Sequence, residues 1–169
     1  WDESVFKVEE VEGKTRFHDV AISKEILHAI YDLKFEYCTE VQGEVLPKSI
    51  NGQDIIVQAQ TGTGKTAAFL ITIFNHIIKS NENIKRKPGT PFALILAPTR
   101  ELVLQIEKDA KGLAKYTNLS ILSILGGMGY KQQQHTLQTK QCDILICTPG
   151  RLIDFMNKKI VNLRKIEIL

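Results

Sequence analysis

The segment 59–66 combines residue types that can hold a phosphate group. It reads Ala59-Gln60-Thr61-Gly62-Thr63-Gly64-Lys65-Thr66, between the apolar run 54–57 and the helix-forming run 67–71. Glycine lets the backbone turn its N–H groups toward an anion. A helix that begins at this point presents its positive end to the same anion. Lys65 can neutralise the terminal phosphates of a nucleotide, and the Thr66 hydroxyl can ligate Mg²⁺.

The segment therefore predicts a site for nucleotide phosphates. Ala59 stands where the general phosphate-loop pattern has glycine, so the match is partial at one end. The alternative is a turn of glycine and threonine that only connects a strand to a buried helix. The loop by itself does not indicate which nucleotide is bound.

Strands and helices are expected to alternate from residue 54 onward, which predicts the α/β class. Apolar runs predict strands at 54–58, 92–97, 120–125 and 143–147, and helical patterns occupy 65–79, 100–116, 130–139 and 150–157. This order is typical of an open, mostly parallel sheet with helices on both faces. Ligands of such sheets bind at the carboxyl ends of the strands. The loops that begin at residues 59, 98, 126 and 148 are therefore expected along one rim.

The N-terminal part has a different pattern. Residues 1–16 are charged and are expected to form a mobile arm outside the core, with one domain over 17–169. Ser23 resembles an N-cap, and a helix face follows at Ile26, Leu27, Ile30 and Leu33. A second short helix is expected after Thr39, reaching Pro47.

Composition excludes several classes of protein. The 169 residues fit one domain, and the net charge of +3 permits nucleic-acid binding without requiring it. The three cysteines lack metal-ligand spacing, which predicts reduced thiols and a cytoplasmic location. No run approaches the roughly 18 apolar residues of a membrane span. The polar stretch 80–90 and the glutamines at 132–134 are expected to be solvated.

Three further segments carry phosphate-binding residue types just after predicted strands. They are Pro98-Thr99-Arg100-Glu101-Leu102, Gly126-Gly127 and Thr148-Pro149-Gly150-Arg151-Leu152. Arginine, threonine hydroxyls and backbone N–H groups bind phosphates without sequence preference. Glycine lets a nucleic-acid backbone come close. The alternative is that the glycine pairs are ordinary strand-to-helix turns.

Together with 59–66 and with 34–42, these segments resemble, in order and content, the first RecA-like domain of DEAD-box RNA helicases. The resemblance covers about 17–169 and is strongest to the bacterial group that includes the RNA-degradosome helicase. It implies an ATP-dependent RNA helicase that uses ATP and Mg²⁺. The implied partners are RNA, a second RecA-like domain, and proteins of RNA decay or ribosome assembly.

The resemblance assigns an adenine site to the N-terminal part. Gln42 would contact adenine through its amide, and Phe17 would stack on the base. Gln42 is also the last residue of a Thr39-x-x-Gln42 capping box, and Phe17 could instead pack the arm onto the domain. The family has glycine where Lys34 stands and proline where Glu40 stands. The implied ATP-binding residues are Phe17, Phe35, Thr39, Gln42, Ala59, Gln60, Thr61, Gly62, Thr63, Gly64, Lys65 and Thr66, with Lys65 and Thr66 catalytic and Thr66 on the metal.

The resemblance also assigns an RNA site to the rim. Glu101 is expected to orient neighbouring groups, because its carboxylate would repel RNA. The implied RNA-binding residues are Pro98, Thr99, Arg100, Gly126, Gly127, Thr148, Pro149, Gly150 and Arg151.

The last residues predict a further strand. Residues 166–169 are apolar apart from Glu167, and we expect the parent polypeptide to continue into the Asp-Glu-Ala-Asp motif of the family. The chain alone is then expected to bind adenine nucleotide and RNA without hydrolysing ATP. Two alternatives remain: another phosphate-loop NTPase, such as a DNA helicase or translocase, and a non-catalytic RNA-binding module.

Overall fold

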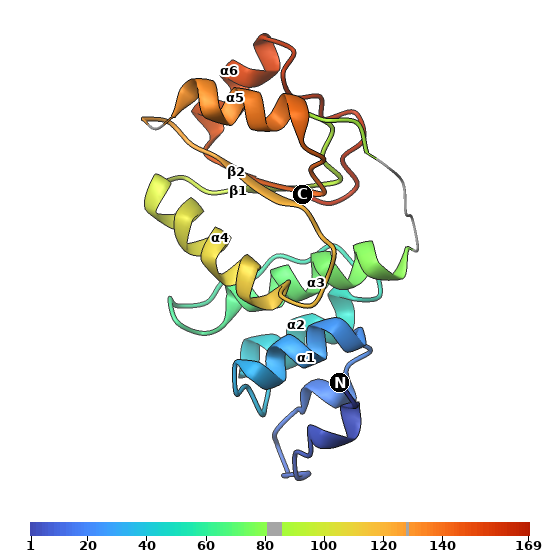
Figure 1. The fold of residues 1–169 in the computed structure, drawn as a ribbon. Helices are drawn as coiled ribbons and strands as arrows, with labels where there is room; N and C mark the ends of the chain where they lie inside the picture. The colour runs from blue at the N-terminus through green and yellow to red at the C-terminus, as the bar shows by residue number, and fades with distance from the viewer. Residues whose placement is uncertain (81–85, 128) are drawn as a thin grey trace. The chain divides into compact units, whose positions relative to one another are not determined.

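The computed structural model describes residues 1–80, 86–127 and 129–169 (Figure 1). The described chain divides into two compact units. One unit contains 1–80 and 112–118, and the other contains 86–111 and 119–169. The first carries the segment 59–66 and the second carries the three rim segments.

The second unit is built on a parallel sheet, as the sequence predicts. Its strands are β1 (Ala93–Leu96), β2 (Ile121–Ile124) and β3 (Ile144–Cys147), in the order β1-β3-β2. The central strand β3 is buried along its whole length, which explains why its sequence lacks polar alternation. Leu96 and Ile124 both align with Cys147. The three strands therefore end at the same edge of the sheet.

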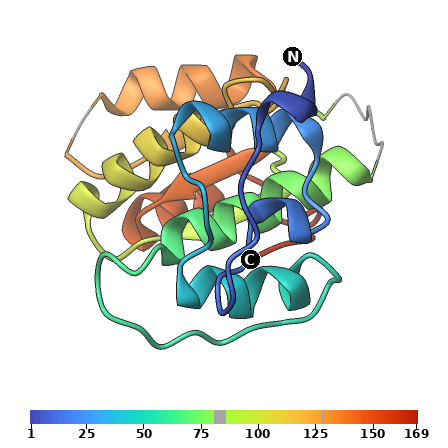
Figure 2. The ribbon, with the colours of Figure 1, turned by 90° about the horizontal axis from the view of Figure 1, so that it is seen from below.

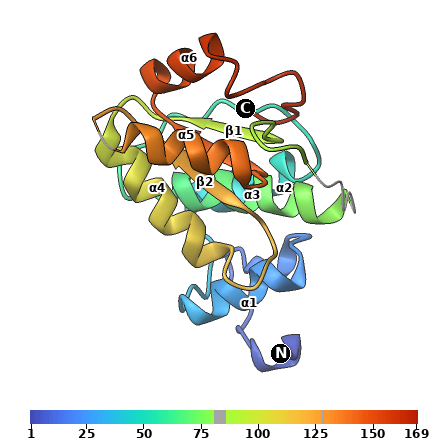
Figure 3. The same ribbon diagram turned by 45° about the horizontal axis from the view of Figure 1, so that its top comes forward.

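Helices cover both faces of this sheet. They are α4 (Arg100–Leu113), α5 (Tyr130–Thr139) and α6 (Pro149–Asn157). Figures 1 and 3 show α5 and α6 on one face and α4 on the opposite face. The core under α5 and α6 contains Leu94, Ile124, Leu137, Cys142, Leu145, Cys147, Leu152, Phe155, Ile160 and Val161.

The first unit is helical. It contains the 3₁₀ helices η1 (Glu3–Val5) and η2 (Phe17–Asp19), and the α-helices α1 (Lys24–Asp32), α2 (Glu40–Ser49) and α3 (Lys65–Lys79).

A buried amide ties the start of α1 to α3. Asn75 of α3 is 1% exposed; its Oδ1 accepts from the Ser23 backbone N–H at 2.8 Å, and its Nδ2 donates to Ala21 O at 3.1 Å. The Ser23 side chain makes no capping hydrogen bond. Ser23 is the N-cap residue of α1, as the sequence predicts, but Asn75 and not the Ser23 hydroxyl fixes the entry to the helix.

The N-terminal arm contributes to the core of the first unit. Phe6 is 7% exposed, and its ring lies 4.4 Å from His18 and 5.5 Å from Tyr31. The Trp1 ring stacks on His28 at 4.6 Å. Through these two aromatic contacts the segment 1–16 packs on the unit. Its high charge had predicted an arm outside the core.

No strand forms at 54–58, where the sequence predicts one. Figure 2 shows the segment between α2 and α3 as a long irregular loop, and Ile56 is fully exposed. A strand exists only through pairing. The outer edge of β1 is taken instead by residues 167–168: Leu94 N donates to Ile168 O, and Glu167 N donates to Phe92 O, both at 2.9 Å. Residues 166–169, where the sequence also predicts a strand, form only an isolated bridge at Ile168.

One charged side chain of the polar stretch 80–90 is buried, although solvation was expected. The Arg86 Nε lies 3.2 Å from Asp143 Oδ1, with the two side chains 7% and 9% exposed. The Arg86 guanidinium also lies 4.2 Å from the centre of the Phe92 ring. The rest of that stretch at 81–85 lies outside the described residues. Among the described helices, none is both long and apolar enough to cross a bilayer.

Candidate functional site

The segment 59–66 forms a glycine-rich turn at the start of α3. Gly62 and Gly64 have φ angles of 82° and 85°, in the left-handed region that favours glycine. Gly64 is the residue that precedes the helix. A Cβ at position 64 would lie 2.5 Å from Gln42 Nε2, so only glycine fits this close approach.

The Lys65 ammonium lies among the carbonyl groups of its own loop. It donates to Ala59 O at 2.5 Å and to Gln60 O. The Thr63 hydroxyl donates to Gln60 O at 2.9 Å. An entering phosphate would replace these carbonyls as the partner of Lys65, exchanging neutral acceptors for charged ones. The donors that a nucleotide phosphate needs are present in the loop.

Gln42 and Thr39 connect α2 to this loop. The capping box is complete: Thr39 N donates to Gln42 Oε1 at 2.9 Å, and Gln42 N donates to Thr39 Oγ1 at 3.3 Å. The same side chains reach the loop, because Gln42 Nε2 donates to Gly64 O at 3.2 Å and the Thr39 hydroxyl donates to Thr63 O at 2.8 Å. Gln42 is 4% exposed, so the hydrogen bond from its amide stabilises the loop from the buried side.

The other predicted adenine contacts differ in exposure. Phe17 is completely buried, which agrees with the packing alternative, and stacking on a base would require it to become exposed. Phe35 is 40% exposed. Lys34 adopts a positive φ of 57°, the conformation that the family's glycine allows without cost. Glu40 is the first residue of α2, where a carboxylate faces the positive end of the helix.

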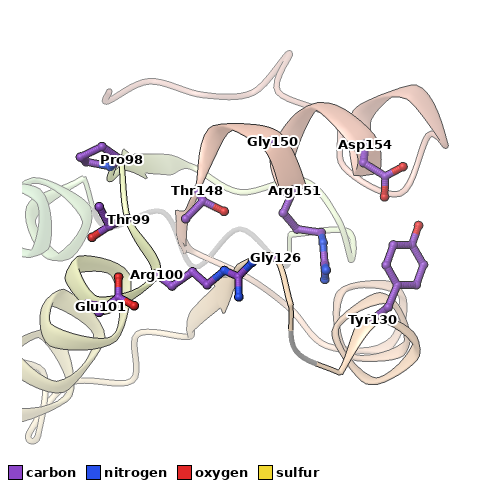
Figure 4. A pocket seen from close by; sticks show the side chains of 10 residues that line it. All are labelled: Pro98, Thr99, Arg100, Glu101, Gly126, Tyr130, Thr148, Gly150, Arg151 and Asp154. Carbon is purple, nitrogen blue, oxygen red and sulfur yellow. The ribbon is translucent and has the colours of Figure 1, made fainter.

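The rim segments meet in a groove of about 660 Å³ at the carboxyl edge of the sheet (Figure 4). The common register of β1, β2 and β3 brings their following loops together here. Seven of the nine predicted RNA residues line the groove; Gly127 and Pro149 do not. The lining residues are Pro98, Thr99, Arg100, Glu101, Gly126, Tyr130, Thr148, Gly150, Arg151 and Asp154.

Arg100 lies against the glycine turn after β2. A Cβ added at Gly127 would lie 2.1 Å from Arg100 Nη1, whereas one added at Gly126 would lie 3.7 Å from Arg100 Nη2. Gly127 also has a φ of 77°. The glycine pair therefore lets the guanidinium of Arg100 rest on the turn. Thr99 has a structural role beside it, since its hydroxyl accepts from Leu102 N at 3.2 Å and caps α4.

Arg151 is held in place by groups from α5 and α6. Its Nη1 donates to Gln133 Oε1 at 2.9 Å, and its guanidinium lies 4.9 Å from the Tyr130 ring centre and 5.4 Å from that of Phe155. Figure 4 shows Arg100 and Arg151 extending toward the Gly126 turn from different helices. Solvation of Gln133 was expected and is wrong, because this side chain is half-buried and bonded to its neighbours.

The far end of the groove carries a carboxylate. Asp154 and Tyr130 face one another there (Figure 4), and Lys158 Nζ lies 3.2 Å from Asp154 Oδ1. The hydrogen bond with Tyr130, followed by the one with Lys158, lowers the pKa of Asp154 below its usual value. Tyr130 and Asp154 were not predicted from the sequence. For Asp154, helical spacing could have indicated the position, because it lies one turn after Gly150.

The described residues offer few metal ligands. No group of three histidine, cysteine, aspartate or glutamate side chains among them could hold a metal ion. Thr66, in the first turn of α3, is the predicted contact for Mg²⁺. This donor set fits a cation that arrives bound to nucleotide phosphates.

A family model and several known proteins match the sequence of this chain. The family model of the DEAD/DEAH box helicase matches residues 39–169. The chain is 52% identical over 162 residues to the ATP-dependent RNA helicase RhlB of Pseudomonas putida, covering 96% of the chain and 41% of that relative. It is 51% identical to RhlB of Pseudomonas aeruginosa over the same shares, and 44% identical to RhlB of Shewanella piezotolerans over 90% of the chain and 35% of the relative. The chain thus spans about two fifths of the length of these relatives. With a family match across most of its length, the chain belongs to the DEAD/DEAH box helicases.

Proposed function

We propose that the protein containing this chain is an ATP-dependent RNA helicase, and that this chain supplies its phosphate loop and part of its RNA-binding surface. The observation that carries the proposal is the groove, where two arginines from separate helices meet beside a glycine turn. The names of the relatives, all RhlB, support the same activity.

The groove is suited to the backbone of a single RNA strand. Arg100 and Arg151 supply cations, Thr148 supplies a hydroxyl that caps no helix, and Gly150 leaves backbone accessible. These groups bind phosphate and ribose and do not distinguish bases. Binding is therefore expected to be independent of RNA sequence and to weaken as salt rises.

The loop 59–66 is suited to the phosphates of ATP. Lys65 would leave the carbonyls of Ala59 and Gln60 for the terminal phosphates, and the N–H groups at the start of α3 would complete the cradle. Thr66 would meet Mg²⁺. ATP, when bound and hydrolysed, would supply the free energy for remodelling RNA, and Mg²⁺ would neutralise the charge on its phosphates. Gln42 would contact adenine, or transmit its presence to Gly64 through the bond that it already makes.

Duplex unwinding by the full protein tests this proposal. We expect RNA-stimulated ATP hydrolysis and separation of a short RNA duplex, both lost on Lys65→Ala. Strand separation of DNA in preference to RNA would instead support a DNA helicase or translocase. RNA binding without nucleotide-dependent activity would support a non-catalytic module.

We further propose that residues 1–169 alone bind adenine nucleotide weakly and turn over little ATP. The support is that the chain spans about two fifths of the length of its relatives. An RNA-stimulated ATPase rate that scales with the concentration of this chain and disappears on Lys65→Ala would contradict this.

The remaining partners follow from the same proposal. A second RecA-like domain of the parent protein would close over the ATP, and proteins of RNA decay or ribosome assembly would deliver the RNA. Three free cysteines fit a reducing compartment, and we propose the cytoplasm. Fractionation of the cells that make the protein tests the location.

A further inference from the structure

Gln133 links two walls of the groove, although it does not line the groove itself. Its Oε1 accepts from Leu125 N at 3.0 Å, and its Nε2 donates to Leu125 O at 3.2 Å. The same Oε1 accepts from Arg151 Nη1 at 2.9 Å. One carboxamide from α5 thus contacts both the residue after β2 and an arginine of α6.

The contact with Leu125 replaces a missing strand partner. The ladder between β2 and β3 ends at the pair Ile124 and Cys147, and Leu125 is the next residue. Leu125 is 4% exposed, so its backbone N–H and C=O need partners inside the protein. Gln133 satisfies both groups, and this fixes the backbone from which the turn Gly126-Gly127 begins.

The contact with Arg151 holds a cation in one orientation. Two aromatic rings flank the guanidinium, and the Gln133 oxygen accepts a hydrogen bond from it that favours one orientation. An arginine that is already ordered loses less side-chain entropy when it binds phosphate. Since Arg100 rests on Gly127, Gln133 influences the placement of both arginines.

We propose that Gln133 is a positioning residue for RNA binding, which acts through the Gly126-Gly127 turn and through Arg151. The proposal rests on the RNA-binding function proposed above. It assigns a role to a side chain that is not among the residues lining the groove.

Gln133→Met tests the proposal, because methionine keeps the length of the side chain and removes its polar atoms. We expect affinity for a short fluorescent oligouridine to fall about tenfold, the effect of one charge-assisted hydrogen bond. Affinity for adenine nucleotide should stay unchanged, since the hydrogen bonds of Gln133 with Leu125 and Arg151 position groups of the RNA groove. Gln138→Ala, an exposed glutamine of the same helix, serves as the matched control and should change neither affinity.

A double-mutant cycle separates positioning from general structural damage. In an Arg151→Ala background the effect of Gln133→Met on RNA affinity should shrink to about threefold or less, because the hydrogen bond between Gln133 and Arg151 is already absent. An equal effect in both backgrounds, or unchanged RNA affinity in Gln133→Met, would overturn the proposal. If the wild-type chain binds no RNA, the proposed function itself fails. If only Arg151→Ala weakens binding, the function stands and the role of Gln133 does not.

A measurement on the unaltered chain remains decisive even if Gln133→Met does not fold. Rotation of the Arg151 guanidinium, followed by ¹⁵N NMR, should be slower than that of Arg164, whose residue is exposed. Equal rotation of the two groups would show that Gln133 does not hold Arg151, and would overturn the proposal.

Discussion

The two neighbouring glycines of the groove should respond very differently to the same substitution. Gly127 has a φ of 77°, and a Cβ there would lie 2.1 Å from Arg100 Nη1. Gly126 has no positive φ, and its Cβ would lie 3.7 Å from the nearest Arg100 atom, an ordinary contact. Alanine at position 127 must therefore strain the backbone and displace Arg100, whereas alanine at 126 should do neither.

The magnitudes follow from these two effects. A left-handed conformation costs an alanine about 1–2 kcal/mol of folding free energy. Displacing the guanidinium adds little to that cost, because the flexible end of Arg100 can move into solvent. Loss of one charge-assisted hydrogen bond to phosphate, about 1.5–3 kcal/mol, should weaken RNA binding by about 10- to 100-fold. For Gly126→Ala we expect a stability change within about 0.5 kcal/mol and a loss of RNA affinity that is smaller than for Gly127→Ala.

Denaturant unfolding and RNA titration by fluorescence anisotropy measure the two effects separately. In an Arg100→Ala background, Gly127→Ala should keep its stability cost and lose most of its effect on RNA affinity. Equal RNA affinities for the Gly126→Ala and Gly127→Ala variants would refute the idea that Gly127 makes room for Arg100. A Gly127→Ala effect on RNA that persists without Arg100 would refute it as well.

Three further predictions concern other parts of the chain. Gln42→Ala should lower the free energy of unfolding by about 1–3 kcal/mol, because it breaks a capping box and removes one of the two donors to Gly64 O, leaving only Ala68 N. It should also weaken adenine-nucleotide binding in calorimetry. Gln53→Ala, at an exposed glutamine, should do neither, and equal effects of the two substitutions would contradict the role of Gln42 in supporting the loop. Asp143→Ala should cost about 3–5 kcal/mol in denaturant unfolding, because the buried charge of its ion-pair partner is left uncompensated, whereas an effect as small as that of exposed Lys87→Met would contradict a buried pair. Burial raises the pKa of all three cysteine thiols to about 12, so iodoacetamide should label the folded chain slowly near neutral pH and the unfolded chain rapidly, and fast labelling of the folded chain would contradict this.

Much of the second unit could be predicted from its sequence. Helical periodicity predicted 130–139 with the observed limits of α5, and apolar runs located β1, β2 and β3. Local patterns suffice here because each strand is buried on both faces and each helix has one apolar side. The same alternation placed the rim segments at one edge of the sheet.

The failures arise where a residue's role depends on a distant partner. The apolar run 54–58 has strand-forming residues, but it pairs with no strand among the described residues. Arg86 lies in a polar stretch whose composition gives no sign of the buried Asp143, 57 positions later. Gln133 lies in the same polar stretch as its exposed neighbour Gln132. The two differ only in that Gln133 bonds to the backbone of Leu125, just after β2. Phe17 is an aromatic residue whose burial the sequence left open.

The salt dependence of RNA affinity tests most directly whether the groove binds the RNA backbone. For a single strand, the slope of log affinity against log salt falls by about 0.7 for each phosphate contact that is lost. Arg100→Ala combined with Arg151→Ala should therefore reduce the slope by about 1.4, while Arg164→Ala, at an exposed arginine outside the groove, should leave it unchanged. An unchanged slope and affinity in the double variant would contradict the assignment of this groove to RNA.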